Sequence, residues 1–206
     1  GSLLEIFGAD SLGKLSGSAT AHFELSGKVP LNDTNLAESL LRLNKEVDVH
    51  SSGLAFSSAN RSFEADSIVV HLKDNHLAVE HFTGNADGTR VHASGIAHNA
   101  LTYLMKGTVP AHAKGELHIG TYRAQSDTST GRLTIPQGFD YHLNVRVDSI
   151  IYKDFVATGL TSNITLNKSL YLNNFSTRTL GGTLSGDIAM HPYANGMVTQ
   201  LKVTGT

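Results

Sequence analysis

Alternation of apolar and polar residues at every second position is the feature that most constrains this chain. The clearest run is FDYHLNVRV, in which Phe139, Tyr141, Leu143, Val145 and Val147 alternate with polar residues. Successive side chains of a β-strand point to opposite faces of its sheet, so this period predicts a strand with one apolar face and one polar face. At about 3.3 Å per residue, the run extends roughly 30 Å.

The same period recurs along most of the chain. Turn-forming pairs separate the runs, among them Asp74-Asn75, Asp87-Gly88, Asn167-Lys168 and Asn195-Gly196. We therefore predict a mainly β protein built from consecutive hairpins. The remaining predicted strands lie within residues 16–29, 66–73, 76–82, 89–97, 113–122, 162–167, 169–175, 183–190 and 198–205.

One segment has a helical period instead. In NDTNLAESLLRLNKEVDV (32–49) the apolar residues predict one amphipathic helix of about three turns, with its leucines packed on one end of the sheet. Asp33 or Thr34 is a suitable N-cap. The apolar positions at helical spacing are Leu36, Leu40, Leu43 and Val47. The segment HNALTYLMKG (98–107) is ambiguous, and its Thr-Tyr pair together with the following Gly-Thr-Val-Pro favours a strand.

Two parts of the chain resemble each other. Residues 67–97 can be laid over a second unit near 161–190, with Phe82 on Phe175 and Gly95 on Gly186. The glycines of the second unit, Gly182 and Gly186, are expected at a bend or bulge, where a side chain would obstruct the curl of the sheet. We interpret residues 1–60 as N-terminal strands plus the helix, and 61–206 as the repeated β-meander region. We expect them to form one continuous unit within a longer chain.

The composition excludes several classes of site. The chain has no cysteine, so thiol catalysis, disulfides and cysteine-based metal sites are excluded. Its net charge of −2 argues against non-specific nucleic-acid binding, which needs a concentrated basic surface. No apolar run approaches the roughly 20 residues of a membrane-spanning helix.

Catalytic and metal motifs are also missing. The sequence has no G-x-S-x-G elbow and no phosphate-binding glycine loop with its lysine. Of the 11 histidines, His71, His76 and His81 recur every five residues, a spacing that places neighbours on opposite strand faces. Neither H-x-H nor H-E-x-x-H occurs. We interpret the histidines as solvated side chains and predict a non-enzymatic protein with no cofactor and no metal.

The apolar face of such a sheet must be covered. A second sheet, closure of the sheet on itself, or a ligand held on a curled sheet would each do so. We predict a curved antiparallel sheet of meander repeats with one amphipathic helix. The alternation alone leaves open whether the apolar face is an exposed groove or a closed core.

Residues 135–190 carry a recognisable order of motifs. A strand led by Ile135-Pro136 is followed by Ile151-Tyr152 at a turn, by an N-I-T-L hairpin that ends at Phe175, and by the Gly181-to-Gly186 strand. This order and spacing resemble the C-terminal region of AsmA-like proteins. The segment 62–97 resembles the same unit more loosely. Residues 1–60 share only its general character and none of its motifs.

The resemblance implies a bacterial envelope protein that lies in the periplasm and is anchored to the inner membrane through a segment outside this sequence. It implies lipid transport or outer-membrane assembly through an apolar concave β surface, with lipid acyl chains and envelope membrane proteins as partners. The alternative is a secreted or surface β-sandwich adhesin or glycan-binding module, which predicts exposed aromatic residues at loop tips. The candidate groove residues are Phe139, Tyr141, Leu143, Val145, Val147, Ile164, Leu166, Leu170, Leu172 and Phe175.

Overall fold

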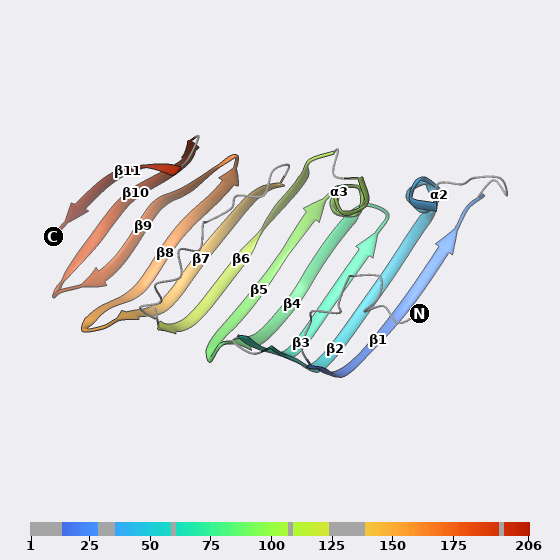
Figure 1. Ribbon diagram of the computed structural model, residues 1–206, viewed down its shortest axis with the longest axis horizontal. Helices are drawn as coiled ribbons and strands as arrows, with labels where there is room; N and C mark the ends of the chain where they lie inside the picture. The colour runs from blue at the N-terminus through green and yellow to red at the C-terminus, as the bar shows by residue number, and fades with distance from the viewer. Residues whose placement is uncertain (1–13, 29–35, 59–60, 107–108, 124–138, 194–195) are drawn as a thin grey trace.

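The fold is one curved, unclosed sheet (Figure 1). The computed structural model describes residues 14–28, 36–58, 61–106, 109–123, 139–193 and 196–206. The prediction of a mainly β, curved sheet is confirmed. Its strands are β1 (Lys14–Ser26), β2 (Asn44–Ser58), β3 (Arg61–Lys73), β4 (His76–Ala86), β5 (Thr89–His98), β6 (Ala111–Arg123), β7 (Phe139–Tyr152), β8 (Phe155–Asn167), β9 (Ser169–Thr179), β10 (Gly182–Tyr193) and β11 (Gly196–Gly205).

Strand order in the sheet follows the sequence from β1 to β11. Neighbouring strands pair antiparallel, with one exception: β6 and β7 are parallel. The expectation of a wholly antiparallel sheet is wrong at this pair. Parallel neighbours need a connection that returns along the full strand length, and residues 124–138, which link β6 to β7, lie outside the described part.

Aspartates fix two of the predicted hairpin turns. Asp74 and Asp87 have positive φ angles of 54° and 49°, which Asp tolerates better than most residues. Their carboxylates also accept backbone N–H groups of neighbouring strands, from Lys45 at 3.2 Å and from Ser62 at 2.7 Å. The turn at Asn167-Lys168 is present too, while that at Asn195-Gly196 falls partly outside the described residues.

The helix α2 (Leu36–Arg42) is shorter than expected, about two turns. Its predicted last apolar position, Val47, lies in β2 opposite Phe23 and Leu72, where cross-strand pairing outweighs helical spacing. Lys45 is buried and donates through Nζ to the carbonyls of Leu41 (3.3 Å) and Leu43 (2.7 Å), which satisfies groups at the helix end. The proposed caps Asp33 and Thr34, and the side chains of Leu36 and Leu40, lie outside the described part.

A second helix, α3 (Ala100–Lys106), replaces the strand expected at 98–107. The side chain of Asn75, in the β3–β4 turn, accepts the Thr102 N–H at 3.0 Å and donates to Thr102 Oγ1 at 2.7 Å. This bond satisfies one of the free N–H groups of the first helical turn. Because the partner lies 27 residues earlier, no local pattern indicated it.

The two similar segments form two three-stranded meanders, β3–β4–β5 and β8–β9–β10, and each contains a bulge in its middle strand. The register shifts by one residue between Val79 and Phe82 in β4, and between Leu172 and Phe175 in β9. In β9 the bulge residue Asn174 has φ 52°, and its N–H donates to Asp187 Oδ1 at 2.8 Å. The register pairs Phe82 with Ala93 and Phe175 with Gly186. When the two meanders are aligned by this pairing, Gly186 corresponds to Ala93. The sequence comparison aligns Gly186 with Gly95, two residues further along.

The expectation for Gly182 and Gly186 is confirmed. Gly186 has φ 157° and lies at the β9–β10 register shift, and a Cβ there would collide with the Lys202 carbonyl on β11. A Cβ on Gly182 would collide with the carbonyl of Thr206. Both positions allow backbones to approach more closely than a side chain would permit.

We expect Gly186→Ala to lower the free energy of unfolding by more than about 1 kcal/mol, because alanine is strained at this φ and meets backbone. Gly120→Ala is the matched control, since its Cβ would find its nearest neighbour at an ordinary 3.5 Å. Urea denaturation of both variants measures the difference. Equal stabilities would show that the sheet does not need the close approach at Gly186.

Candidate functional site

A row of apolar residues and glycines crosses the whole sheet on one face. Cross-strand pairing puts one such residue from each of the eleven strands at the same level. With strands about 4.8 Å apart, the row is roughly 50 Å long. Its members are Ala21, Val49, Val70, Val79, Gly95, Gly115, Leu143, Ile164, Leu172, Ile188 and Leu201.

A second row lies beside it and is apolar up to β10. It ends on Thr199 in β11. Together the two rows form a continuous strip, which we call the apolar strip. The members of the second row are Phe23, Val47, Leu72, Leu77, Ala97, Ala113, Tyr141, Leu166, Leu170 and Met190.

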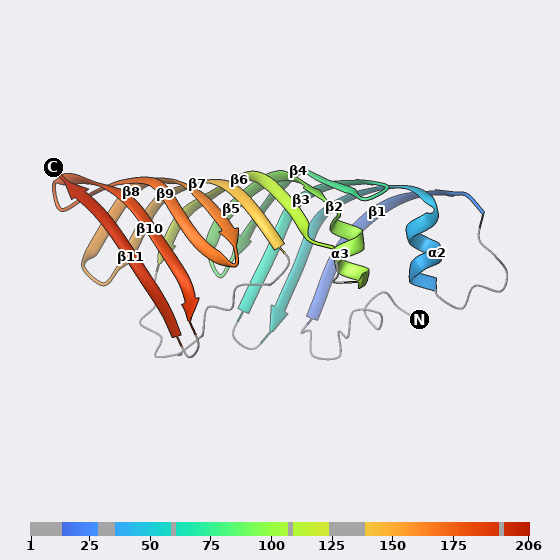
Figure 2. The same ribbon diagram turned by 90° about the horizontal axis from the view of Figure 1, so that it is seen from above.

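The apolar strip lies on the concave side of the sheet. Both helices are on this side in Figure 2, and α3 contacts β4 and β6. Burial raises the pKa of the Tyr141 phenol, and the nearby phenol of Tyr103 on α3 raises it further. Tyr103 of α3 therefore lies near Tyr141, a member of the apolar strip.

The structure brings the predicted groove residues together. Tyr141, Leu166 and Leu170 share one level of β7, β8 and β9, and Leu143, Ile164 and Leu172 share the next. Phe139 pairs with Ala111 through its backbone, and its side chain lies outside the described part. The most buried members of the predicted set are Val145 (8% exposed), Val147 (5%) and Phe175 (6%).

The sequence reasoning missed the contribution of β3 to β6. A hollow of about 380 Å³ lies on the apolar strip, with Gly95 and Gly115 on its floor. The apolar–polar alternation that could have predicted these lining residues is present in 66–73, 76–82 and 113–122, but no groove residue was assigned in those segments. Apolar side chains line it, including Val70, Leu77, Val79, Phe82, Leu117 and Leu143.

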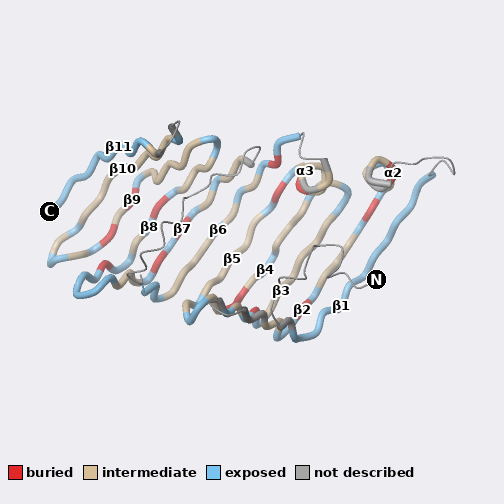
Figure 3. The backbone as a smooth tube through the Cα atoms, viewed as in Figure 1, coloured by how far each residue is buried: buried red, intermediate tan, exposed pale blue. Residues whose placement is uncertain are grey.

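Within the described ranges, the concave face has little cover. Only α2 and α3 lie on it, and no large side chain is fully buried (Figure 3). β1 and β11 are the two free edges of the sheet. The described strands thus form neither a second packed layer nor a closed core, and the apolar strip is the main apolar surface that no other described element covers fully.

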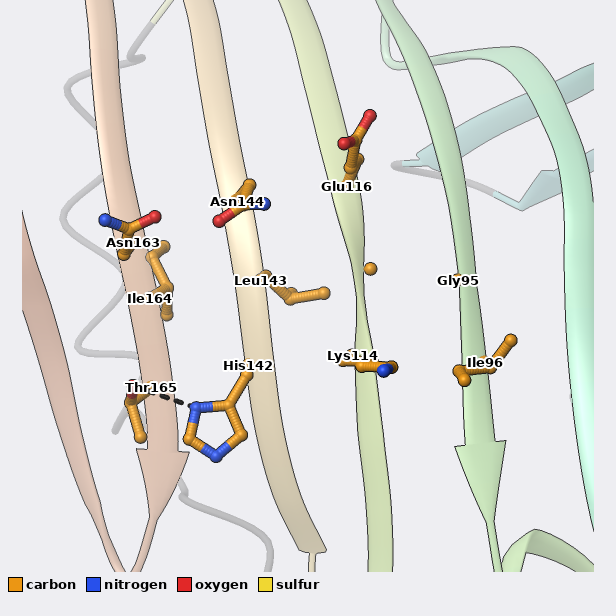
Figure 4. Close-up of a pocket in the computed structure, with 11 residues that line it drawn as sticks. Gly95, Ile96, Lys114, Glu116, His142, Leu143, Asn144, Asn163, Ile164 and Thr165 are labelled. Carbon is orange, nitrogen blue, oxygen red and sulfur yellow. Dashed lines mark hydrogen bonds between the residues drawn. The ribbon is translucent and has the colours of Figure 1, made fainter.

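The opposite face is polar and also hollowed. A depression of about 560 Å³ lies on this face, lined by side chains that include Lys114, Glu116, His142 and Asn144 of β6 and β7 (Figure 4). His142 Nδ1 lies 3.3 Å from Thr165 Oγ1, within hydrogen-bonding distance.

Histidines on the polar face pair with carboxylates. His71 bonds to Asp48 and lies 3.5 Å from Glu80, while His118 lies 2.8 Å from Asp148. The expectation that His71, His76 and His81 alternate between faces is wrong, because the β3–β4 turn and the β4 bulge bring all three to the polar face. Among the described residues, no group of three His, Asp or Glu is placed to hold a metal ion.

These contacts shift the pKa values of two of the groups. The hydrogen bond that Asp48 accepts from His71 raises the pKa of His71 above its usual value, and Glu80 adds to the effect. The hydrogen bond from His118 lowers the pKa of Asp148, helped by the positive charge of Arg146. The polar face therefore carries histidine–carboxylate pairs at partly exposed positions.

Comparison of the chain with protein-family models, curated proteins and solved structures gave no significant match. Among the described helices, none is long and apolar enough to cross a membrane.

The His71–Asp48 pair should make stability depend on pH. Because folding raises the pKa of His71, its contribution is complete below the unfolded value of about 6.5 and is lost as pH rises through the folded pKa. We expect His71→Gln to destabilise the protein more near pH 6 than near pH 8 in urea titrations.

Asp48→Asn should remove the same pH-dependent contribution, and the double variant should add nothing further. Retention of the full pH dependence in Asp48→Asn would show that the carboxylate of Asp48 does not hold the proton of His71.

Proposed function

We propose that this chain is a non-enzymatic, periplasmic section of an AsmA-like envelope protein. It would hold lipid acyl chains on its apolar strip, and so serve lipid transport between membranes or outer-membrane assembly. The observation that carries the proposal is the row of apolar residues and glycines that runs unbroken from Ala21 to Leu201 across every strand. The family, the compartment and the membrane anchor rest on the resemblance of residues 135–190 alone.

The dimensions of the strip suit hydrocarbon chains. One acyl chain spans about half of the roughly 30 Å hydrocarbon core of a bilayer, so a strip of about 50 Å exceeds its length. Each buried CH₂ contributes about 0.8 kcal/mol without any directional contact. Binding of this kind discriminates poorly between chains, and we expect a mixture of cellular lipids to co-purify.

Adjacent residues of β7 provide a matched test. Leu143 lies in the 380 Å³ hollow, whereas Asn144 points to the polar face. We expect Leu143→Asp to reduce co-purified lipid severalfold, because the carboxylate must lose hydration when an acyl chain covers it. Asn144→Asp, which adds the same charge one residue away, should retain the wild-type amount.

Lipid extraction with mass spectrometry measures the bound lipid, and circular dichroism checks that both variants are folded. Wild-type protein free of lipid, or equal lipid in the two folded variants, would contradict the proposal. Val145 is less suitable for this test because it is only 8% exposed, so a charge there threatens the fold itself.

A glycan-binding module is the second candidate. The observation in its favour is the exposure of Tyr152 (43%) and Phe155 (40%) beside a hairpin turn. The described strands, however, form a single sheet rather than the sandwich that this alternative predicts. Glycan binding that survives Leu143→Asp and is lost in Tyr152→Ala would favour it.

A further inference from the structure

Exposed apolar residues gather where β6, β7 and β9 end and β8 begins. We call this group the tip patch. Register places its members close together: Tyr122 lies opposite Ile150 near the end of β7, Tyr152 pairs with Phe155, and Ala157 pairs with Thr179 next to Leu180. Their exposed fractions are 49% for Tyr122, 43% for Tyr152, 40% for Phe155, 45% for Val156 and 90% for Leu180.

Leu180 is the most unusual residue of the tip patch. It occupies the first position of the β9–β10 turn with φ 50°, followed by Gly181 with φ 83°. The β4–β5 turn has the same backbone shape, with φ 49° and 80°, but carries Asp87-Gly88. Asp suits this conformation, whereas a bulky residue there is a conformational outlier.

The comparison of the two turns shows that Leu180 does not serve the fold. Its backbone is strained and its apolar side chain is almost fully exposed to water, and an aspartate would avoid both. A strained residue that contributes nothing to the stability of the fold is grounds for a functional inference.

Cations surround the tip patch. Lys153, in the β7–β8 turn, places its ammonium 5.5 Å from the centre of the Tyr152 ring. Arg123 ends β6 and Arg178 lies near the end of β9, and both are exposed. Asp154 is the one acidic residue in the β7–β8 turn. Aromatic and basic side chains around an exposed leucine are the chemistry of the membrane–water interface.

We propose that the tip patch docks these strand ends on the surface of an anionic phospholipid membrane. Leu180 and Phe155 enter the boundary between headgroups and acyl chains, the tyrosines lie at headgroup level, and Lys153, Arg123 and Arg178 face the lipid phosphates. The contact does not require the apolar strip to hold lipid, so the two proposals can fail separately.

Flotation of the whole chain with vesicles tests the docking. Phosphatidylcholine vesicles with and without phosphatidylglycerol are the probes, and we expect binding only to the anionic ones. Leu180→Asn keeps a residue that suits the turn, and should weaken binding roughly tenfold. Its thermal midpoint should stay equal or rise. Lys153→Gln should weaken binding about fivefold, and less at high salt.

Val198→Asn is the matched control. Val198 is 47% exposed and pairs with His191, outside both the apolar strip and the tip patch, so its replacement should leave vesicle binding unchanged. Unchanged binding in Leu180→Asn would overturn the proposal, as would an equal loss in Val198→Asn or equal binding to neutral vesicles. Glycan binding by the tip patch without vesicle binding would also overturn it.

Discussion

The structure depends on keeping the apolar side chains on one face of the sheet across ten successive strand pairings, a property that we call side-chain parity. In a sheet, a slip of one residue moves every following side chain to the other face. The apolar strip therefore exists only because each pairing, from Ala21–Val49 to Ile188–Leu201, joins residues of the same face. The one-residue bulges in β4 and β9 shift the register against both neighbouring strands, so the rows on either side remain in line.

Parity also explains what the sequence could predict. Alternation is local, so the strands and the face of Tyr141, Leu143, Ile164 and Leu172 could be read directly. The predicted helix begins where expected but ends before Val47, and the strand expected at 98–107 is a helix, because distant partners decide both: Val47 pairs with Phe23 and Leu72, and Thr102 bonds to Asn75. The parallel pairing of β6 with β7 was equally hidden, since a period of two is the same for either strand direction.

Among the described residues, only two short helices pack on the sheet as a second layer. Each strand contacts its sequence neighbours, and the two short helices add contacts at one end. Such a structure is close to one-dimensional: its stability is the sum of successive strand pairings, as in repeat proteins. A fold of this kind can leave a long apolar strip exposed, because its strands are held by backbone hydrogen bonds and cross-strand pairs rather than by a second layer.

The two meanders show how such a fold can acquire separate chemistries. Both keep the same bulge, and both close with turns of the same backbone shape, so their scaffolds are equivalent. They differ at positions where the backbone conformation does not determine which amino acid is present. Asp87 bonds back to Ser62 and serves the turn, whereas Leu180 projects into water beside Phe155 and Lys153. The concave face is constrained in both copies by parity, but a turn tip is not. Specialisation of one copy for an external surface is therefore expected at its tips first.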